Sequence, residues 1–480
     1  MQSGVTIRDG ASDDGGVGGG DTTTVGPGEA GPAYQEGWPF GRIQYDFLGK
    51  GHGEWVCGVL PQANGQVVLV GTANTDWVSS FTDPAENVFT LVRLNADGKV
   101  DTTFGTDGKT SAAVPRHELN FCRAAVQAKD GKILVAGDAV FSVSHAGGTF
   151  YNDDFVVARF NQDGTLDTGF GDGGMAITNF HLTADDAGQD DKVTSMALLD
   201  DGRILVAGSR GSVQNPSYSY PAFARYTPDG APDPTFGAAG MVALDPTALK
   251  GTLVNSIVRG GATAVIADAD GGAVAGISVS GNSAGYAIAI LRLGPDGNLD
   301  PSFADCGVRW EAPESKWADL EVLQLSRSAD GKLVVLAGYY GASTVLYRYS
   351  AQGLVDPSFG SGGQVTRPNA TQGAWQTLFM LRPADGSFLI GLGAPPVTGG
   401  YGSDSMGTFS LIHFSADGVF DDTFGELGWN WGTGAGAPVA YISAGALLQN
   451  DDIVVAGDIT TNRQYDTNTI ALYLKKSGGH

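Results

Sequence analysis

A motif that recurs at nearly constant spacing constrains this chain more than any other feature of its sequence. The segment LVRLNADGKVDTTFGTDGKTSAAV (residues 91–114) returns as VVARFNQDGTLDTGFGDGGMAIT from residue 156 and as AFARYTPDGAPDPTFGAAGMVAL from residue 222. Its Phe-Gly pair, or a relic of it, occurs seven times at intervals of 64, 66, 66, 67, 56 and 65 residues. The seven phenylalanines are Phe40, Phe104, Phe170, Phe236, Phe303, Phe359 and Phe424. A period of this kind is typical of repeat architectures.

Each repeat predicts four short strands. The third repeat contains the apolar runs VTSMALL, RILVAG, AFARYT and MVAL, separated by the turn DDG, a variable loop and the turn region PDGAPDPTFGAAG. Asp-Gly between apolar runs indicates tight hairpin turns, because glycine takes the positive φ that such turns require. Seven such units predict an all-β protein, a seven-bladed β-propeller with four antiparallel strands per blade. A solenoid is the alternative, but it should have capping units at its ends.

The two ends of the repeat region are complementary. The chain stops in TIALYLKKSGGH, where a third strand is expected, and the missing fourth strand is found in EGWPFGRIQYDFLGKG (residues 36–51). We therefore predict that residues 42–48 pair with residues 469–475 and complete the last blade, which removes a free sheet edge. The propeller should span residues 34–476, and residues 477–480 should form a short C-terminal tail.

The core pattern R-[LFY]-x-x-x-G-x-x-D-x-x-F-[GA] occurs five times in order, and the sixth repeat has His413 in place of the arginine. In this pattern the chain resembles the delta-60 repeat family, a family of mostly exported bacterial β-propellers. The resemblance covers roughly residues 36–476. It implies a propeller and export, but it implies no single activity and no functional residues.

Composition bears on location and on partners. Residues 1–33 are rich in Gly, Asp, Ser and Thr, which predicts a flexible tether, and no signal sequence follows Met1. Such a tether is typical of the segment after the lipidated cysteine of a bacterial lipoprotein, so we expect an extracytoplasmic protein with a lipid anchor upstream of this chain. A net charge of −24 argues against nucleic-acid binding. No apolar run approaches the roughly 18 residues of a transmembrane helix.

Recurrent charged residues form one series of arginines in the third strand and one series of aspartates after the following turn. In the seventh repeat both charges are absent, since Tyr473 and Gly37 take the two positions. Joint loss is what a structural ion pair predicts, because a lone buried charge is costly. The expected pairs are Arg93–Asp101, Arg159–Asp167, Arg225–Asp233, Arg292–Asp300, Arg348–Asp356 and His413–Asp421.

Calcium is the other interpretation of the oxygen-rich turns. The segment NADGKVD contains Asn95, Asp97 and Asp101, but it lacks the dense acidic ligands and the late glutamate of an EF-hand loop. Capping of the turn by Asn and Asp side chains explains these residues more simply than a surface calcium site.

The end of the blades that carries the second-to-third-strand and blade-to-blade connections should hold the function, because its loops differ from repeat to repeat. We call it the variable end, and the opposite end, with its repeated tight turns, the turn end.

A non-enzymatic recognition or scaffold protein that binds a protein or a glycan is the favoured class. Loop aromatics suit such binding. They are Trp77, Phe141, Tyr151, Tyr218, Tyr220 and Tyr401.

A metal-dependent enzyme is the alternative class. His52, His117 and His181 lie 12, 13 and 11 residues after their Phe-Gly phenylalanines, and His145 lies in the long loop of blade 2. Imidazoles that converge at the mouth of the central channel could bind zinc, copper or iron. Against this alternative, the other blades have no matching histidines, and the chain has no serine-nucleophile elbow, phosphate-binding loop or HExxH helix.

Three cysteines give no disulfide framework. Cys57 and Cys122 are expected at matching positions of neighbouring inner strands, where their side chains would point alike, so the sequence predicts no disulfide between them.

Overall fold

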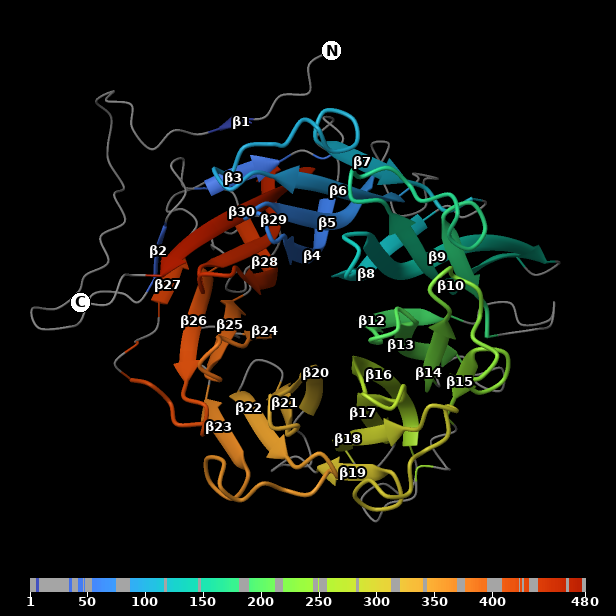
Figure 1. The fold of residues 1–480 in the computed structure, drawn as a ribbon, viewed down its shortest axis with the longest axis vertical. Helices are drawn as coiled ribbons and strands as arrows, with labels where there is room; N and C mark the ends of the chain where they lie inside the picture. Colours follow the sequence, from blue (N-terminus) through green and yellow to red (C-terminus); the bar gives the residue numbers. More distant parts are fainter. Residues whose placement is uncertain are drawn as a thin grey trace, which may run out of the picture. The chain divides into compact units, whose positions relative to one another are not determined.

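The computed structural model describes residues 6–7, 34–36, 42–45, 47, 54–74, 87–115, 119–145, 148–180, 190–211, 219–244, 249, 257–281, 285–311, 320–339, 343–368, 376–394, 408–422, 424, 427–430, 439–462 and 466–476. Every element in these residues is a β-strand. The strands form seven four-stranded blades of a seven-bladed β-propeller, as predicted (Figure 1).

The first three blades follow the chain in order. Blade 1 consists of β4 (Glu54–Pro61), β5 (Val67–Asn74), β6 (Asn87–Leu94) and β7 (Lys109–Ala112). Blade 2 consists of β8 (Leu119–Gln127), β9 (Ile133–His145), β10 (Gly148–Phe160) and β11 (Met175–Thr178). Blade 3 consists of β12 (Lys192–Leu198), β13 (Ile204–Gly211), β14 (Ser219–Tyr226) and β15 (Met241–Ala243).

The next three blades repeat the same strand order. Blade 4 consists of β16 (Ile257–Ala267), β17 (Ala273–Gly281), β18 (Gly285–Leu293) and β19 (Val308–Glu311). Blade 5 consists of β20 (Leu320–Arg327), β21 (Leu333–Tyr339), β22 (Ser343–Tyr349) and β23 (Gln364–Pro368). Blade 6 consists of β24 (Gln376–Leu381), β25 (Phe388–Ala394), β26 (Thr408–Phe414) and β27 (Leu427–Asn430).

Blade 7 joins the two ends of the chain. Its strands β28 (Val439–Leu447), β29 (Ile453–Asn462) and β30 (Asp466–Lys476) are completed by β3 (Arg42–Tyr45), in antiparallel register from Arg42 opposite Leu472 to Tyr45 opposite Thr469. The predicted closure is confirmed for these four residues. Two further strands flank it: β2 (Tyr34–Glu36) pairs with the end of β30, and β1 (Thr6–Ile7) pairs with β3. Apart from β1, the predicted tether lies outside the described residues, as does the tail.

The chain divides into two compact units, which are considered separately. One unit comprises Met1–Asn74, Leu91–Lys109 and Asn369–His480, and the other comprises Thr75–Thr90 and Thr110–Pro368. Blades 2 to 5 belong to the second unit.

The hydrophobic core lies between adjacent blades. Between blades 2 and 3, Phe155 and Val157 of β10 pack in one cluster with Val193 of β12 and Val206 of β13. All eight residues of the second strand β5 are buried, whereas the first strand β4 alternates between buried and more exposed residues. Both faces of a middle strand are covered by neighbouring sheets, and the sequences of these strands are therefore largely apolar along their whole length.

Candidate functional site

The repeated arginines and aspartates form ion pairs within their blades, as predicted. The shortest N–O distances are 2.7 Å for Arg93–Asp101, 2.8 Å for Arg159–Asp167, 2.7 Å for Arg225–Asp233, 3.0 Å for Arg292–Asp300 and 2.7 Å for Arg348–Asp356. In blade 6, His413 Nδ1 lies 2.9 Å from Asp421 Oδ2. These residues belong to the scaffold.

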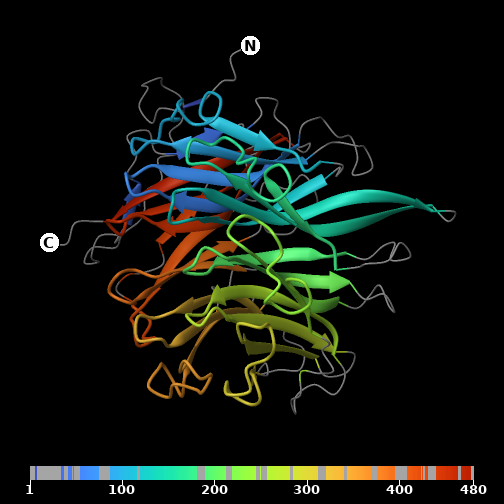
Figure 2. The ribbon, with the colours of Figure 1, turned by 45° about the vertical axis from the view of Figure 1, so that its right-hand side comes forward.

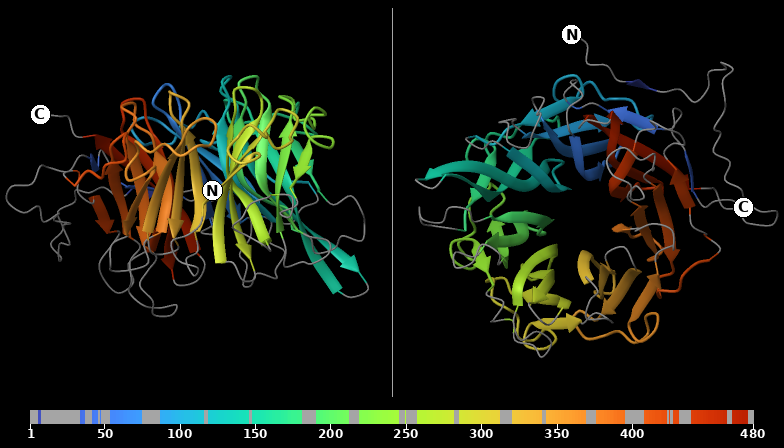
Figure 3. Two further views of the ribbon diagram at one scale, coloured as in Figure 1. Left: turned by 90° about the horizontal axis from the view of Figure 1, so that it is seen from below. Right: turned by 180° about the vertical axis from the view of Figure 1, so that it is seen from behind.

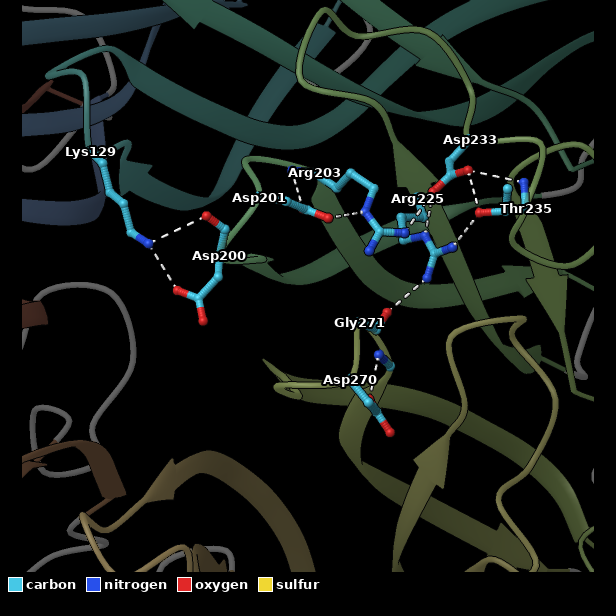
Figure 4. Close-up of polar contacts among 10 residues, drawn as sticks. Lys129, Asp200, Asp201, Arg203, Arg225, Asp233, Thr235, Asp270 and Gly271 are labelled. Atoms are coloured by element: carbon cyan, nitrogen blue, oxygen red, sulfur yellow. Dashed lines mark hydrogen bonds and ion pairs between the residues drawn. The ribbon is translucent and has the colours of Figure 1, made fainter.

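Arg225 shows how much of the scaffold one such arginine holds (Figure 4). Its Nε donates to Asp233 Oδ2, its Nη2 donates to Thr235 Oγ1 at 2.9 Å, and its Nη1 donates to the carbonyl of Gly271 in blade 4 at 2.8 Å. The guanidinium also lies 4.4 Å from the centre of the Phe236 ring. Arginine, aspartate and Phe-Gly phenylalanine thus form one contact group. We call this group the clasp.

The clasp also connects blade 2 to blade 3, blade 3 to blade 4 and blade 4 to blade 5. Gly171, which follows Phe170, donates its N–H to the carbonyl of Asp229 in the third-to-fourth-strand turn of blade 3 at 2.8 Å. The Phe170 ring lies directly against Gly230 of that turn, which has φ +89°. The same hydrogen bond recurs from Gly237 to Asp296 and from Ala304 to Gln352.

Replacing Gly230 by alanine should destabilise the protein more than the same change at Gly173. A Cβ on Gly230 would lie 2.8 Å from the Phe170 ring and from the Gly171 nitrogen, whereas a Cβ on Gly173 would meet nothing within 4 Å. Both glycines have positive φ, so Gly173→Ala is a matched control for backbone strain. We expect Gly230→Ala to cost about 2 kcal/mol more in the free energy of unfolding. Equal losses in urea denaturation would contradict the inter-blade contact.

The clasp carboxylates are held in the ionised form. Burial alone would raise the pKa of Asp233, but hydrogen bonds from Thr235 and the charges of Arg203 and Arg225 outweigh it and lower the pKa to about 2. The pKa of Asp101 is lowered to about 2 in the same way, by Thr103 and Arg93 against burial. Groups of this acidity are poor proton donors at neutral pH, which suits a structural role better than acid–base catalysis.

Blade 7 uses another carboxylate where the pair is absent. Tyr473, at the arginine position, donates its hydroxyl hydrogen bond to Asp452, which lies just before the second strand β29. Burial and this hydrogen bond raise the pKa of Tyr473 to about 12. In blade 7 the hydroxyl of Tyr473, a neutral donor, therefore replaces the arginine, and Asp452 accepts its hydrogen bond.

The two aspartates considered as alternative calcium ligands in blade 1 are engaged in the turn and the clasp. Asp97 Oδ1 accepts from the Lys99 backbone N–H at 3.1 Å, and Asp101 binds Arg93 and Thr103. The turn-capping interpretation is confirmed for these two aspartates. In the part of the chain that the structure describes, no group of three or more His, Cys, Asp or Glu side chains is arranged to bind a metal ion.

At the variable end, the long connection of blade 2 is a hairpin, not the irregular loop that the sequence suggested. β9 and β10 pair without a break from Ile133 opposite Phe160 to His145 opposite Gly148. They extend past their neighbours, because β8 pairs with β9 only as far as Val140 and β11 pairs with β10 only from Phe155 (Figures 2 and 3). Phe141, His145 and Tyr151 thus lie on strands.

Two of the candidate aromatic side chains can be placed. Phe141 lies on β9 and is half-buried, and Tyr220 lies on β14, directly opposite Arg210 of β13. The Arg210 guanidinium lies 5.5 Å from the centre of the Tyr220 ring. Tyr220 is therefore also a strand residue, whereas the sequence predicted that it lies in a loop. Trp77, Tyr218 and Tyr401 lie outside the described residues, and nothing is described for the side chain of Tyr151.

The candidate metal ligands are not tested by the described geometry. His52, His117 and His181 lie outside the described residues, and His145 is described only through its backbone, at the end of β9.

A feature that the sequence did not reveal is a β-bulge at the same position of all seven first strands. The bulge residue in blade 3 is Thr194, whose hydroxyl donates to the carbonyls of Ala207 and of Ala262 in blade 4. Ser443 of blade 7 donates in the same way to Val56 of blade 1 at 2.9 Å. The seven bulge residues are Cys57, Arg123, Thr194, Thr263, Leu323, Leu378 and Ser443.

The bulges correct the prediction for the cysteines. Cys57 is a bulge residue, whereas Cys122 is the residue before a bulge, so their positions do not match and their side chains need not point alike. Both are disulfide-bonded in the structure, and Cys306 is a free, exposed thiol. The prediction that these cysteines are not disulfide-bonded is wrong.

First strands also carry exposed side chains that the search for loop residues missed. Trp55 on β4 is 41% exposed, although most aromatic side chains of the described residues are buried or half-buried. Arg123 on β8 and Glu321 on β20 are exposed as well. Alternation of buried and exposed residues in EWVCGV was the signal that could have identified Trp55.

Comparison with known proteins supports a β-propeller repeat family. Five stretches match the family model described as "Domain of unknown function (DUF5122) beta-propeller". They are residues 62–104, 146–170, 199–236, 273–303 and 328–359. No curated protein has a significantly similar sequence.

Solved structures that match this chain do so at low sequence identity and with TM-scores below 0.5. A protein of unknown function from Dyadobacter fermentans DSM 18053 is 11% identical, with a TM-score of 0.46 over 93% of this chain and 100% of that one. Trypanosoma rangeli sialidase, in complex with 2,3-difluorosialic acid, is 12% identical with a TM-score of 0.42, over 84% of this chain and 59% of its own. NanB sialidase from Streptococcus pneumoniae is 11% identical with a TM-score of 0.39, over 87% and 67%. Similarity at this level carries no argument about activity.

Proposed function

We propose that this protein is an exported recognition or scaffold propeller of the delta-60 repeat type, which binds a protein or a glycan through the variable end of its blades. The observation that carries the proposal is the β9/β10 hairpin, which extends the middle of blade 2 beyond the strands on either side. Projecting elements on a rigid repeat scaffold are where binding residues concentrate.

The polar side chains at the two ends of the blades are engaged differently, and this difference supports the proposal. At the turn end, Arg225, Asp233 and their equivalents are engaged in clasps, and the turn aspartates cap their own turns. At the variable end, Tyr220 and Arg210 place an aromatic ring beside a guanidinium on neighbouring strands. Aromatic and arginine side chains contribute most of the affinity in many protein interfaces.

Shortening the hairpin should weaken binding and leave the fold intact. Because Phe141 lies opposite Asn152, residues 142–151 can be replaced by the two-residue turn Asn-Gly without changing the register below it. A ligand identified with the full chain on glycan arrays and surface-protein fractions should bind the shortened variant at least about 30-fold more weakly, which corresponds to about 2 kcal/mol. Its melting temperature should remain that of the full chain.

A change at the turn end provides the control. Leu354 is 60% exposed in the third-to-fourth-strand turn of blade 5, so Leu354→Ser should alter neither affinity nor melting temperature. Equal affinity of the shortened variant would contradict hairpin-mediated recognition. Near-stoichiometric zinc, copper or iron in protein purified without chelator would instead favour the metal-dependent enzyme with His52, His117, His145 and His181 as ligands.

We also propose an extracytoplasmic location, with a lipid anchor upstream of this chain. The disulfide-bonded state of Cys57 and Cys122 supports it, because disulfides persist mainly in oxidising compartments. No helix in the described residues has the length and hydrophobicity needed to span a membrane. In cells that express the full gene product, protease added after the outer membrane is permeabilised should degrade this protein and spare cytoplasmic proteins, and survival of the protein would contradict the proposed location.

A further inference from the structure

The junction between blades 2 and 3 differs from the other described junctions in its concentration of charge. The segment that enters blade 3 docks on the β9/β10 strands through two backbone donors. Asp191 N–H donates to the Asp153 carbonyl at 2.9 Å, and Val193 N–H donates to Asp138 Oδ1 at 2.6 Å. The junction lies within the second unit, at the foot of the hairpin.

Four carboxylates and two cations lie at this junction. Asp138 on β9 is 1% exposed and pairs with Arg123 of β8 at 2.7 Å. Asp153 on β10 lies 3.6 Å from Lys192 of β12, and Lys192 also lies 3.0 Å from Asp190. Asp191, which is also buried, directs its Oδ2 to the Phe180 N–H at 2.9 Å.

At neutral pH the carboxylates of this junction are crowded. Burial and the negative charges of Asp190 and Asp138 together raise the pKa of Asp153 to about 6, because Lys192 offsets only part of their effect. Burial also raises the pKa of Asp138, against the attraction of Arg123. Protonation of Asp153 removes one of these negative charges, and it leaves Lys192 paired with Asp190 and Arg123 paired with Asp138.

We propose that the junction between blades 2 and 3 is a proton-responsive contact, which tightens as the pH falls from 7 to 5 and so couples the foot of the β9/β10 hairpin to external acidity. The groups that act are Asp153, Asp138 and Asp190, with Lys192 and Arg123 as their partners. This inference does not depend on what the protein binds.

The direction follows from linkage. The folded pKa of Asp153, about 6, lies above its ordinary value of 3.8, so the folded junction takes up a proton that the opened segment does not hold. Stability of the contact therefore increases as the pH falls through 6 and reaches its full gain near 4. The clasp carboxylates respond in a lower pH range. Because their pKa values are lowered in the folded protein, the stability that they contribute at neutral pH is lost only below about pH 4.

Hydrogen–deuterium exchange of the full chain tests the proposal locally. In peptides that cover residues 190–198, protection corrected for intrinsic exchange should be about tenfold greater at pH 5 than at pH 7.5. Asp153→Asn should show the high protection at both pH values. Asp200→Asn removes an equal charge from an ion pair whose side chains are 80% and 90% exposed, and should behave as the wild type.

A second variant keeps the test independent of one substitution. Asp190→Asn removes a repelling carboxylate, so it should reduce the pH dependence without abolishing it. Wild-type protection that does not change between the two pH values, or a pH dependence that survives in Asp153→Asn, would overturn the proposal.

Discussion

Replacing Arg225 by alanine should lower the free energy of unfolding by about 3 kcal/mol. The side chains of Arg225 and Asp233 are only 1% and 5% exposed, so removal of the arginine takes the nearer of two cationic partners from a buried carboxylate. Arg203, whose Nη1 lies 3.2 Å from Asp233, remains as its only cationic partner among the described residues. The variant also loses the hydrogen bond to Gly271 of blade 4. Urea denaturation followed by tryptophan fluorescence and by far-UV circular dichroism measures the loss.

Lys129→Ala is the matched control for this variant. Lys129 pairs with Asp200 at 2.8 Å between the turns of blades 2 and 3, but both side chains are almost fully exposed (Figure 4). Exposed pairs contribute little, so this change should cost less than about 0.5 kcal/mol. Similar losses in the two variants would contradict the buried role of the clasp.

A chain that begins at residue 50 should lose cooperative unfolding and aggregate. Without β3 and β2, β30 has an unpaired edge at residues 469–472 and 474–476, and such edges pair with other molecules. Phe47, which is buried in the core cluster between blades 7 and 1, is lost as well. Size-exclusion chromatography with light scattering should show oligomers in place of a monomer-sized species.

Two controls accompany the truncation. A chain that begins at residue 31 keeps β2 and β3 and loses only β1, so its melting temperature should stay within a few degrees of the full chain. A peptide of residues 34–48 added in trans should reduce aggregation of the shorter chain. The same peptide with Ile43→Pro should not, because Ile43 lies opposite Ala471 and proline lacks the N–H that a strand pair uses. A monomeric, cooperatively folded chain from residue 50 would contradict closure by β3.

Periodic features of the sequence were sufficient for the architecture. The seven Phe-Gly pairs, or relics of them, determined the blade number, and the complementary ends predicted the pairing of β3 with β30. Correlated loss of two charges at Tyr473 and Gly37 predicted the ion pairs of the other blades. These inferences succeed because register, turn type and charge pairing are local properties, and the same residues specify them in each repeat.

Other features depend on contacts that the repeated sequence motif does not specify. The hairpin of blade 2 was missed because its Ser-, Gly- and Asn-rich sequence is typical of a loop, although its two halves pair residue for residue. The bulges were missed because an extra residue in an apolar strand leaves no mark in composition, and the error at Cys57 and Cys122 followed directly. The contact of Phe170 with Gly230 joins different repeats, so only the structure could reveal it.

The central claim is that the repeated charges are scaffold, and a double-mutant cycle on Arg225 and Asp233 tests it most directly. Because each single alanine change strands a buried charge, the double change should cost less than the sum of the single changes. We predict a coupling free energy of about 2 to 3 kcal/mol at pH 7. Strictly additive losses, or single variants that melt as the wild type does, would contradict the clasp and return these residues to the candidates for a binding site.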